Sequence, residues 1–392
     1  MQIVFCGGIG NVPRQIMEQD HPNARRGPRT EDILFWPFAG ARFMFESWLG
    51  WLGENSEPPP QSQPALDWTT SHTIALELAT MRLRDFSTQA KGRPALICAP
   101  YALHSAIITD FAPTHSIVQA LQEGGLRRLF VTDWHSADMR MRYLSIDSYL
   151  ADLNAAIDTI GPPVDLIGLC QGGWLSLLFA ARFPQKVRRL VLVGAPVDIS
   201  HRSPLSQTVA SLPPGAFEAL VEPATGLVSG KHLQPTWPSS LVASAEEALQ
   251  RTLAEESDRD RELRDRFARW DDDTLHLPGS YFVQVADWIF RENRIAGGQF
   301  VALGRSIDLS RLRLPLFLLA GSEDQVVPRE QALATAQLVG TPRSQVRIAV
   351  EPSSHLGLMM GRQTMKNAWP RIAEWLAADL EASDRPSAER AA

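Results

Sequence analysis

The sequence predicts an α/β fold, with a doubly wound and mostly parallel sheet and a mainly helical insertion. Short apolar runs alternate with segments of helical periodicity, as strands and crossover helices do in βαβ units. The alternation lapses over 201–298, where the sequence is helical and charged. One apolar run ends in a glycine-rich turn that leads directly into a helical segment, which is typical of a strand–turn–helix unit.

Five apolar runs are the predicted core strands, and a further apolar run follows them near the C-terminus. These runs occupy 95–100, 128–134, 164–170, 188–197, 314–321 and 346–350. Helical patterns lie between them, for example over 149–160 and 174–182. The strands and helices therefore alternate as a doubly wound sheet requires.

The chain divides into four parts on these patterns. The division is an N-terminal helical and aromatic segment with a Pro-rich linker (1–85), an α/β core (86–200 and 299–380), a cap insertion (201–298) and a flexible tail (381–392). The stretch 33–52 is rich in aromatic residues, but Pro37, Arg42 and Glu46 interrupt it, so no membrane span is expected there. A helix packed on the core and an amphipathic helix on a hydrophobic surface both fit it.

Composition excludes several classes of protein. Of the 392 residues 44% are hydrophobic and 21% are charged, which fits a globular enzyme. The net charge of −6 gives no basic footprint, so nucleic acid is not an expected partner. Three cysteines, far apart, indicate neither a disulfide framework nor a metal site. With no signal peptide evident, a reducing cytoplasm is the expected location.

The strongest local signal lies around Cys170. A β-run ends in Gly168-x-Cys170-x-Gly172-Gly173 and continues into a helical segment, which is the context of a nucleophile elbow with cysteine in place of serine. The glycines leave room for close packing around a strained turn. A helix N-terminus favours a thiolate, so Cys170 is the predicted nucleophile. Cys6 and Cys98 are expected to be structural cysteines without a catalytic role.

An oxyanion hole is expected beside the elbow. The backbone N–H of Gln171 would supply one donor, and the loop after the first core strand, at Tyr101 and Ala102, would supply the other.

A base and an orienting acid follow in the chain order of the α/β-hydrolase fold, which is nucleophile, acid, histidine. Asp324 lies in a polar turn after the 314–321 run, and His355 follows the 346–350 run. His355 would take the thiol proton, and Asp324 would fix its tautomer. Glu323 is the alternative orienter. Among nine histidines, His104, His115 and His135 are alternatives that fit surface or loop positions better.

Several stretches together resemble the bacterial polyhydroxyalkanoate synthases, with the intracellular polyhydroxyalkanoate depolymerases close behind. The matching stretches are the cysteine box at 168–173, 99–113, 132–134, 195–198, 270–278 and 307–309. The resemblance covers about 94–376 and gives Cys170, Asp324 and His355 the catalytic roles. Gln325 and Ser354 depart from the family, which usually has histidine after the aspartate and glycine before the histidine.

The resemblance implies transfer of a 3-hydroxyacyl group from a coenzyme A thioester through acyl-cysteine to a growing polyester such as polyhydroxybutyrate. Coenzyme A would be part of the substrate, and no separate cofactor or metal is expected. A depolymerase or another cysteine-type hydrolase of short hydroxyacyl esters is the alternative. A non-catalytic scaffold on polyester granules is an alternative of another class.

Partners follow from the same resemblance. They are the hydroxyacyl-CoA or polyester substrate, a homodimer mate or second subunit, and a granule surface. The arginines Arg142, Arg291 and Arg294 are candidates for the coenzyme A phosphates, although surface positions suit each of them better.

Overall fold

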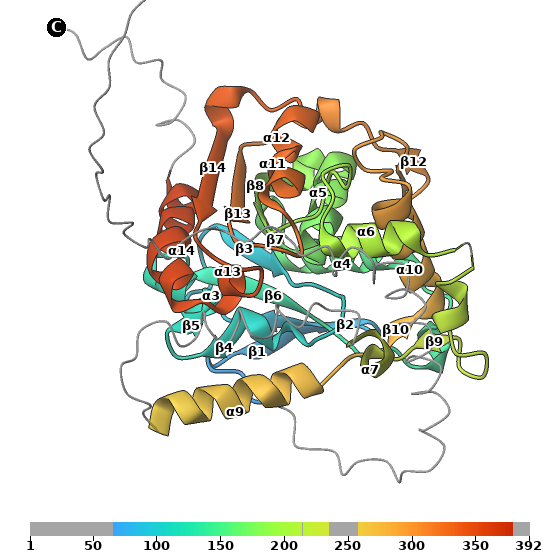
Figure 1. The fold of residues 1–392 in the computed structure, drawn as a ribbon. Helices are drawn as coiled ribbons and strands as arrows, with labels where there is room; N and C mark the ends of the chain where they lie inside the picture. Colours follow the sequence, from blue (N-terminus) through green and yellow to red (C-terminus); the bar gives the residue numbers. More distant parts are fainter. Residues whose placement is uncertain (1–65, 214, 235–257, 379–392) are drawn as a thin grey trace, which may run out of the picture.

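The computed structural model describes residues 66–213, 215–234 and 258–378. An eight-stranded sheet forms its centre, in the order β1-β2-β6-β3-β7-β8-β13-β14 (Figure 1). Its strands are β1 (Thr73–Glu77), β2 (Met81–Asp85), β3 (Pro94–Cys98), β6 (Arg128–Trp134), β7 (Val164–Leu169), β8 (Val187–Val193), β13 (Leu316–Gly321) and β14 (Val346–Glu351). From β6 to β14 all neighbours are parallel, whereas β1 and β2 pair antiparallel. The predicted α/β fold with a mostly parallel sheet is confirmed.

The central strands form because their sequences are apolar on both faces. Every residue of β3, β7 and β13 is buried. Successive side chains of a strand point to opposite faces, so Ile97 and Leu96 of β3 belong to two different core clusters. Both faces must then be covered, which explains why these strands read as continuous apolar runs.

Two pairs of helices cover the two faces of the sheet. Helices α3 (Ile117–Glu123) and α14 (Arg362–Ala377) contact each other on the face that includes Ile97. Helices α4 (Ile146–Ile160) and α5 (Gln171–Arg182) contact each other on the opposite face (Figure 1). A serine capping box starts α4, and Gly161 at a φ of 91° ends it. This packing holds the start of α5 against the middle of the sheet.

The sheet begins before residue 86, which corrects the expected start of the core. Strands β1 and β2 lie within 1–85, the segment expected to be a helical N-terminal part. Met81 and Leu83 are fully buried while Arg82 points to solvent, which is the alternation of an edge-proximal antiparallel strand. Strand β2 pairs with β6, and this long-range pairing stabilises the extended conformation of the segment. The stretch 33–52, the linker and the tail 381–392 lie outside the described residues.

Short elements fill the chain between β8 and β13. They include α6 (Pro204–Ser211), β9 (Leu227–Val228), α7 (Gly230–Leu233), α9 (Asp258–Asp272), β10 (Leu277–Pro278), α10 (Gly279–Gln284), a π-helix (Val285–Arg291), β11 (Val301–Ala302) and β12 (Arg305–Ser306), with 3-10 turns at Glu218–Leu220 and Leu309–Arg311. Strands β9 and β10 pair with each other, as do β11 and β12. We propose that the elements before β11 form the cap. Within the described ranges, no helix has the length and apolar character needed to cross a bilayer.

Candidate active site

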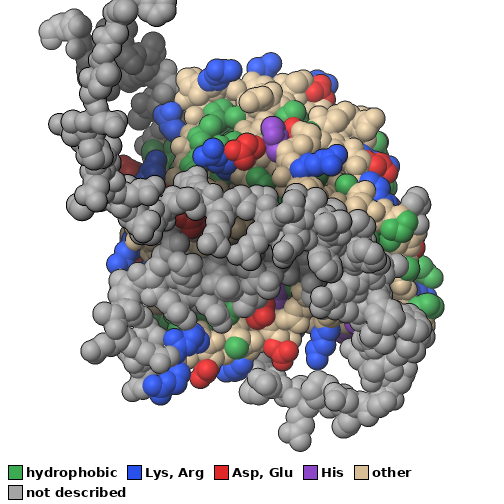
Figure 2. All heavy atoms as spheres, viewed as in Figure 1, with side chains coloured by type: hydrophobic (Ala, Val, Ile, Leu, Met, Phe, Trp, Pro, Cys, Tyr) green, Lys and Arg blue, Asp and Glu red, His purple; other side chains and the backbone are tan. Residues whose placement is uncertain are grey.

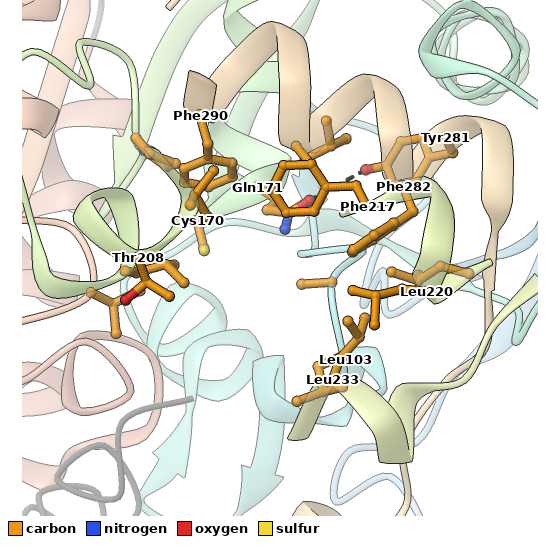
Figure 3. Close-up of a pocket in the computed structure, with 18 of the residues that line it drawn as sticks. Leu103, Cys170, Gln171, Thr208, Phe217, Leu220, Leu233, Tyr281, Phe282 and Phe290 are labelled. Carbon is orange, nitrogen blue, oxygen red and sulfur yellow. Dashed lines mark hydrogen bonds between the residues drawn. The ribbon is translucent and has the colours of Figure 1, made fainter. Parts of the chain in front are cut away.

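Cys170 occupies a sharp turn between β7 and α5. Its φ of 49° and ψ of −115° place a non-glycine residue in the left-handed half of conformational space, where strain is stored. The Cys170 N–H donates to the Val193 carbonyl at 2.9 Å, and the Cys170 carbonyl accepts from the Gly173 N–H at 2.9 Å. These two bonds fix the turn in the centre of the sheet. The sulfur points into a cavity (Figure 3).

The glycines of the elbow let α5 start close to the sheet. A Cβ on Gly172 would lie 2.1 Å from the Cys98 carbonyl oxygen, and one on Gly173 would lie 2.4 Å from the Ala195 Cβ. A Cβ on Gly168 would lie 2.6 Å from the Gly172 carbonyl oxygen. The glycine spacing of this motif therefore has a steric cause.

Gly172→Ala is expected to lower the free energy of unfolding by about 3 kcal/mol, because its methyl group meets the rigid backbone of β3. Urea denaturation checks this value. Gly92→Ala is the matched control, since its added Cβ meets no atom within 4 Å and carries only the strain of a φ of 124°. Equal losses in both variants would contradict the steric explanation.

His355 and Asp324 form a buried pair at the carboxyl ends of β14 and β13. Nδ1 of His355 lies 2.7 Å from Oδ2 of Asp324. The other carboxylate oxygen accepts hydrogen bonds from the N–H groups of Val326 at 2.9 Å and Val327 at 2.8 Å. The carboxylate is thus held in place, and Nδ1 donates to it, which leaves Nε2 of His355 for the nucleophile.

The electrostatics of the pair favour a charged imidazole. Burial lowers the pKa of His355, but the nearby charges of Asp324 and Cys170 and the hydrogen bonds to both raise that pKa well above its ordinary value of 6.5. Burial also raises the pKa of the Cys98 thiol to about 12. Cys98 is therefore inert at neutral pH, whereas Cys170 lies beside a cationic partner.

The alternative residues lie elsewhere or contact other groups. Glu323 is exposed, whereas its neighbour Asp324 reaches His355. The Nδ1 atom of His115 bonds the Met360 carbonyl at 2.8 Å, and that of His135 lies 3.2 Å from the Ala79 carbonyl oxygen.

Two of the three expected oxyanion residues line a cavity with Cys170. These are Ala102 and Gln171, and their backbone N–H groups have no acceptor among the described residues. The Tyr101 ring instead packs against two buried tyrosines, Tyr149 at 4.8 Å and Tyr281 at 5.3 Å between centroids. Ala102 and Gln171 therefore share the cavity with Cys170, whereas Tyr101 does not line it.

Tyr281 is a site residue that sequence reasoning missed. It comes from α10, is 2% exposed and lines the same cavity as Cys170. Its hydroxyl donates to the Tyr101 carbonyl at 3.3 Å. The same hydroxyl lies 3.4 Å from Oε1 of Gln171, a hydrogen bond drawn in Figure 3. A single tyrosine in a cap sequence gives no signal of this, because both acceptors are more than a hundred residues away in the chain.

The cavity in front of Cys170 is almost entirely apolar and encloses about 140 Å³. The 201–298 segment supplies most of its wall, for example Phe217, Phe282 and Phe290 (Figure 3). A second cavity, of about 40 Å³, shares Cys170 with the first and includes His355. Cys170 therefore borders two cavities.

The three candidate arginines all have partners. Arg291 bonds Asp287 at 2.5 Å, while Arg294 bonds Glu292. Arg142 donates to the Met139 carbonyl at 2.7 Å. On the face drawn in Figure 2, basic and acidic side chains likewise occur together. Two of the three, Arg291 and Arg294, therefore have their charge paired with a carboxylate, whereas the printed hydrogen bond of Arg142 is to a neutral carbonyl.

The strand order, the elbow and the chain order of the three side chains define a class of protein. The chain belongs to the α/β-hydrolase fold family, whose model matches residues 100–361. A solved structure, the Paleococcus ferrophilus monoacylglycerol lipase, is 17% identical with a TM-score of 0.47, over 76% of this chain and 98% of that one.

Within this class the chain is similar to polyhydroxyalkanoate synthases, as its motifs predict. The poly(3-hydroxyalkanoate) polymerase subunit PhaC of Haloferax mediterranei is 25% identical over 72% of this chain. The PhaC subunit of Allochromatium vinosum is 26% identical over 73% of this chain. The matched region spans 57% of the first relative and 81% of the second. The predicted family resemblance is confirmed.

Proposed function

We propose that this chain is a polyhydroxyalkanoate synthase-like acyltransferase that moves 3-hydroxyacyl groups from coenzyme A thioesters to a polyester chain. One observation carries the proposal. Cys170, in a strained elbow, lines one cavity with His355, whose imidazole is bonded to buried Asp324 at 2.7 Å. The similarity to PhaC subunits supports the choice of acyl group.

The chemistry follows from these positions. The Cys170 thiolate attacks the thioester carbonyl carbon, and the resulting oxyanion is stabilised by the N–H groups of Gln171 and Ala102. Collapse of this intermediate breaks the carbon–sulfur bond to coenzyme A, whose sulfur takes a proton from His355. The product is acyl-Cys170 with a neutral imidazole. Asp324 holds that imidazole in position throughout.

The apolar cavity suits the acyl part of such a substrate. Its wall carries few polar groups, chiefly Gln171, Thr208 and Tyr281, so the hydrocarbon of a 3-hydroxyacyl group would be desolvated there. We infer that the cap sets which acyl groups fit. We also propose a cytoplasmic location on polyester granules, with coenzyme A acting only as part of the substrate. A homodimer mate or a second subunit is the proposed partner.

The test uses 3-hydroxybutyryl-CoA with the purified full chain. We expect one acyl adduct on Cys170 by mass spectrometry, release of coenzyme A, and less free acid than coenzyme A because the remaining acyl groups enter polymer. Equal amounts of acid and coenzyme A would instead identify a hydrolase. Gln325 and Ser354, which depart from the synthase pattern beside Asp324 and His355, make this second outcome the alternative function. A folded protein that forms no adduct would overturn both.

A further inference from the structure

The smaller of the two cavities at Cys170 differs in chemistry from the larger one. It lies between the catalytic side chains Cys170 and His355 and a polar stretch of the loop after β3, His104 and Ser105. The larger cavity contacts neither of these two loop residues nor His355. The side chain that would act as base therefore faces the smaller cavity.

Two buried polar atoms at this cavity can meet a bound ligand. Oγ of Ser105 has no hydrogen-bond partner among the described residues, and Nε2 of His355 is left there with Cys170 alone, whose thiol is consumed on acylation. Leaving such atoms unpaired is unfavourable, and unpaired buried groups in proteins usually mark a bound water or ligand. Nε2 without its proton accepts a hydrogen bond, and a serine hydroxyl both donates and accepts. Together they match a hydroxyl group.

The far wall of the cavity is fixed by contacts that hold Ser105 in place. Nε1 of Trp270, a buried residue of α9, donates to the Ser105 carbonyl at 3.2 Å. The His104 ring stacks on Trp270 at 4.3 Å, and its Nε2 lies 3.0 Å from the Asp271 carbonyl oxygen. His104 is thus engaged by its neighbours, and Ser105 is the loop side chain free to meet a ligand.

We propose that this smaller cavity is the acceptor site, where the hydroxyl that attacks acyl-Cys170 is bound between His355 and Ser105. The assignment rests on the proposed function and deepens it. The acyl chain occupies the apolar cavity and the acceptor alcohol enters from the other side, so donor and acceptor meet at Cys170. The volume of about 40 Å³ admits a hydroxyl end with its carbon atoms or an ordered water.

The transfer step balances with these groups alone. The acceptor oxygen attacks the acyl carbonyl carbon while its proton moves to Nε2 of His355. The tetrahedral oxyanion then collapses, the carbon–sulfur bond breaks, and the electron pair returns to sulfur. The products are a new ester, the Cys170 thiolate and the His355 imidazolium, which is the starting pair of charges. Ser105 is a binding residue in this step and takes no proton.

The test separates acylation from transfer. The donor is 3-hydroxybutyryl-CoA and the acceptor is methyl 3-hydroxybutyrate. Acylation is measured as the burst of coenzyme A, and transfer as the ester formed at increasing acceptor concentration. Ser105→Ala removes only the hydroxyl, and Ser105→Val also fills space. Ser211→Val is the matched control, because Ser211 is exposed at the end of α6 and lines neither cavity.

We expect Ser105→Ala to keep the burst within twofold and to lower transfer efficiency about tenfold, the effect of one hydrogen bond. Ser105→Val should lower transfer further, and Ser211→Val should change neither quantity. Two results would overturn the acceptor site. In the first, Ser105→Val transfers the acyl group as efficiently as the wild type. In the second, both Ser105 variants lose the coenzyme A burst and the transfer activity to the same extent. Absence of any burst in the wild type would instead overturn the proposed function. Thermal melts confirm that each variant is folded.

Discussion

Cys170→Ala is expected to abolish both the acyl adduct and the release of coenzyme A, with a loss of at least about 10⁴-fold. No other described thiol can replace it, because Cys98 lies within β3 and burial raises its pKa to about 12. Alanine keeps the Cβ and must adopt the same positive φ, so the elbow stays strained but intact. The loss is therefore one of chemistry.

Cys98→Ala is the matched control for this change, since it removes the same atom from another buried site. It should retain activity and lose only about 1 kcal/mol of the free energy of unfolding. Coenzyme A release is followed with a thiol reagent, and folding by circular dichroism. Residual turnover above 1% of wild type in Cys170→Ala would show that the nucleophile lies elsewhere.

Asp324→Asn is expected to reduce acylation about 10⁴-fold, because the amide neither carries charge nor fixes the productive tautomer of His355. In the wild type, the Asp324 and Cys170 charges hold the pKa of His355 well above 6.5 against the effect of burial. Without the carboxylate, burial prevails and that pKa falls. At pH 7 the imidazole then becomes neutral, and the Cys170 thiolate loses part of its stabilisation.

The rate of Cys170 alkylation by iodoacetamide measures this change directly. Alkylation at pH 7 should be slower in Asp324→Asn than in the wild type, because the imidazole beside the thiol is then neutral. The raised pKa of His355 in the folded state also affects stability. The contribution of the charged imidazole to the free energy of unfolding is complete below about pH 6.5 and is lost as pH rises through the raised pKa. Glu323→Gln is the control, since Glu323 is exposed beside the pair. An unchanged rate at pH 7 in Asp324→Asn would contradict the assignment of the orienter.

Local sequence was sufficient for the central strands and for the elbow. The run predicted at 128–134 coincides with β6, and the buried strand β7 ends at Leu169, one residue before Cys170. These features are readable because strands covered on both faces must be apolar throughout, and because close helix–strand packing admits only glycine. The order of Cys170, Asp324 and His355 follows from the connectivity of such a sheet.

Features that depend on long-range contacts could not be predicted. Strand β2 was missed because Met81 and Leu83 alternate with arginines over only five residues, and pairing with β6 decides its conformation. Tyr281 and Ser105 were missed because their roles depend on the approach of the cap to the loop after β3. A lone tyrosine or serine has many ordinary positions in a sequence.

The position of β14 links activity to an edge of the sheet. It is the last strand in the order, pairs with β13, and carries Ile348 and Val350 half exposed. His355 follows it within four residues, whereas Cys170 follows a strand at the centre. Terminal strands open at lower free energy than central ones. We therefore expect warming or mild denaturant to separate His355 from Cys170 while the core is still folded, so that inactivation would precede global melting.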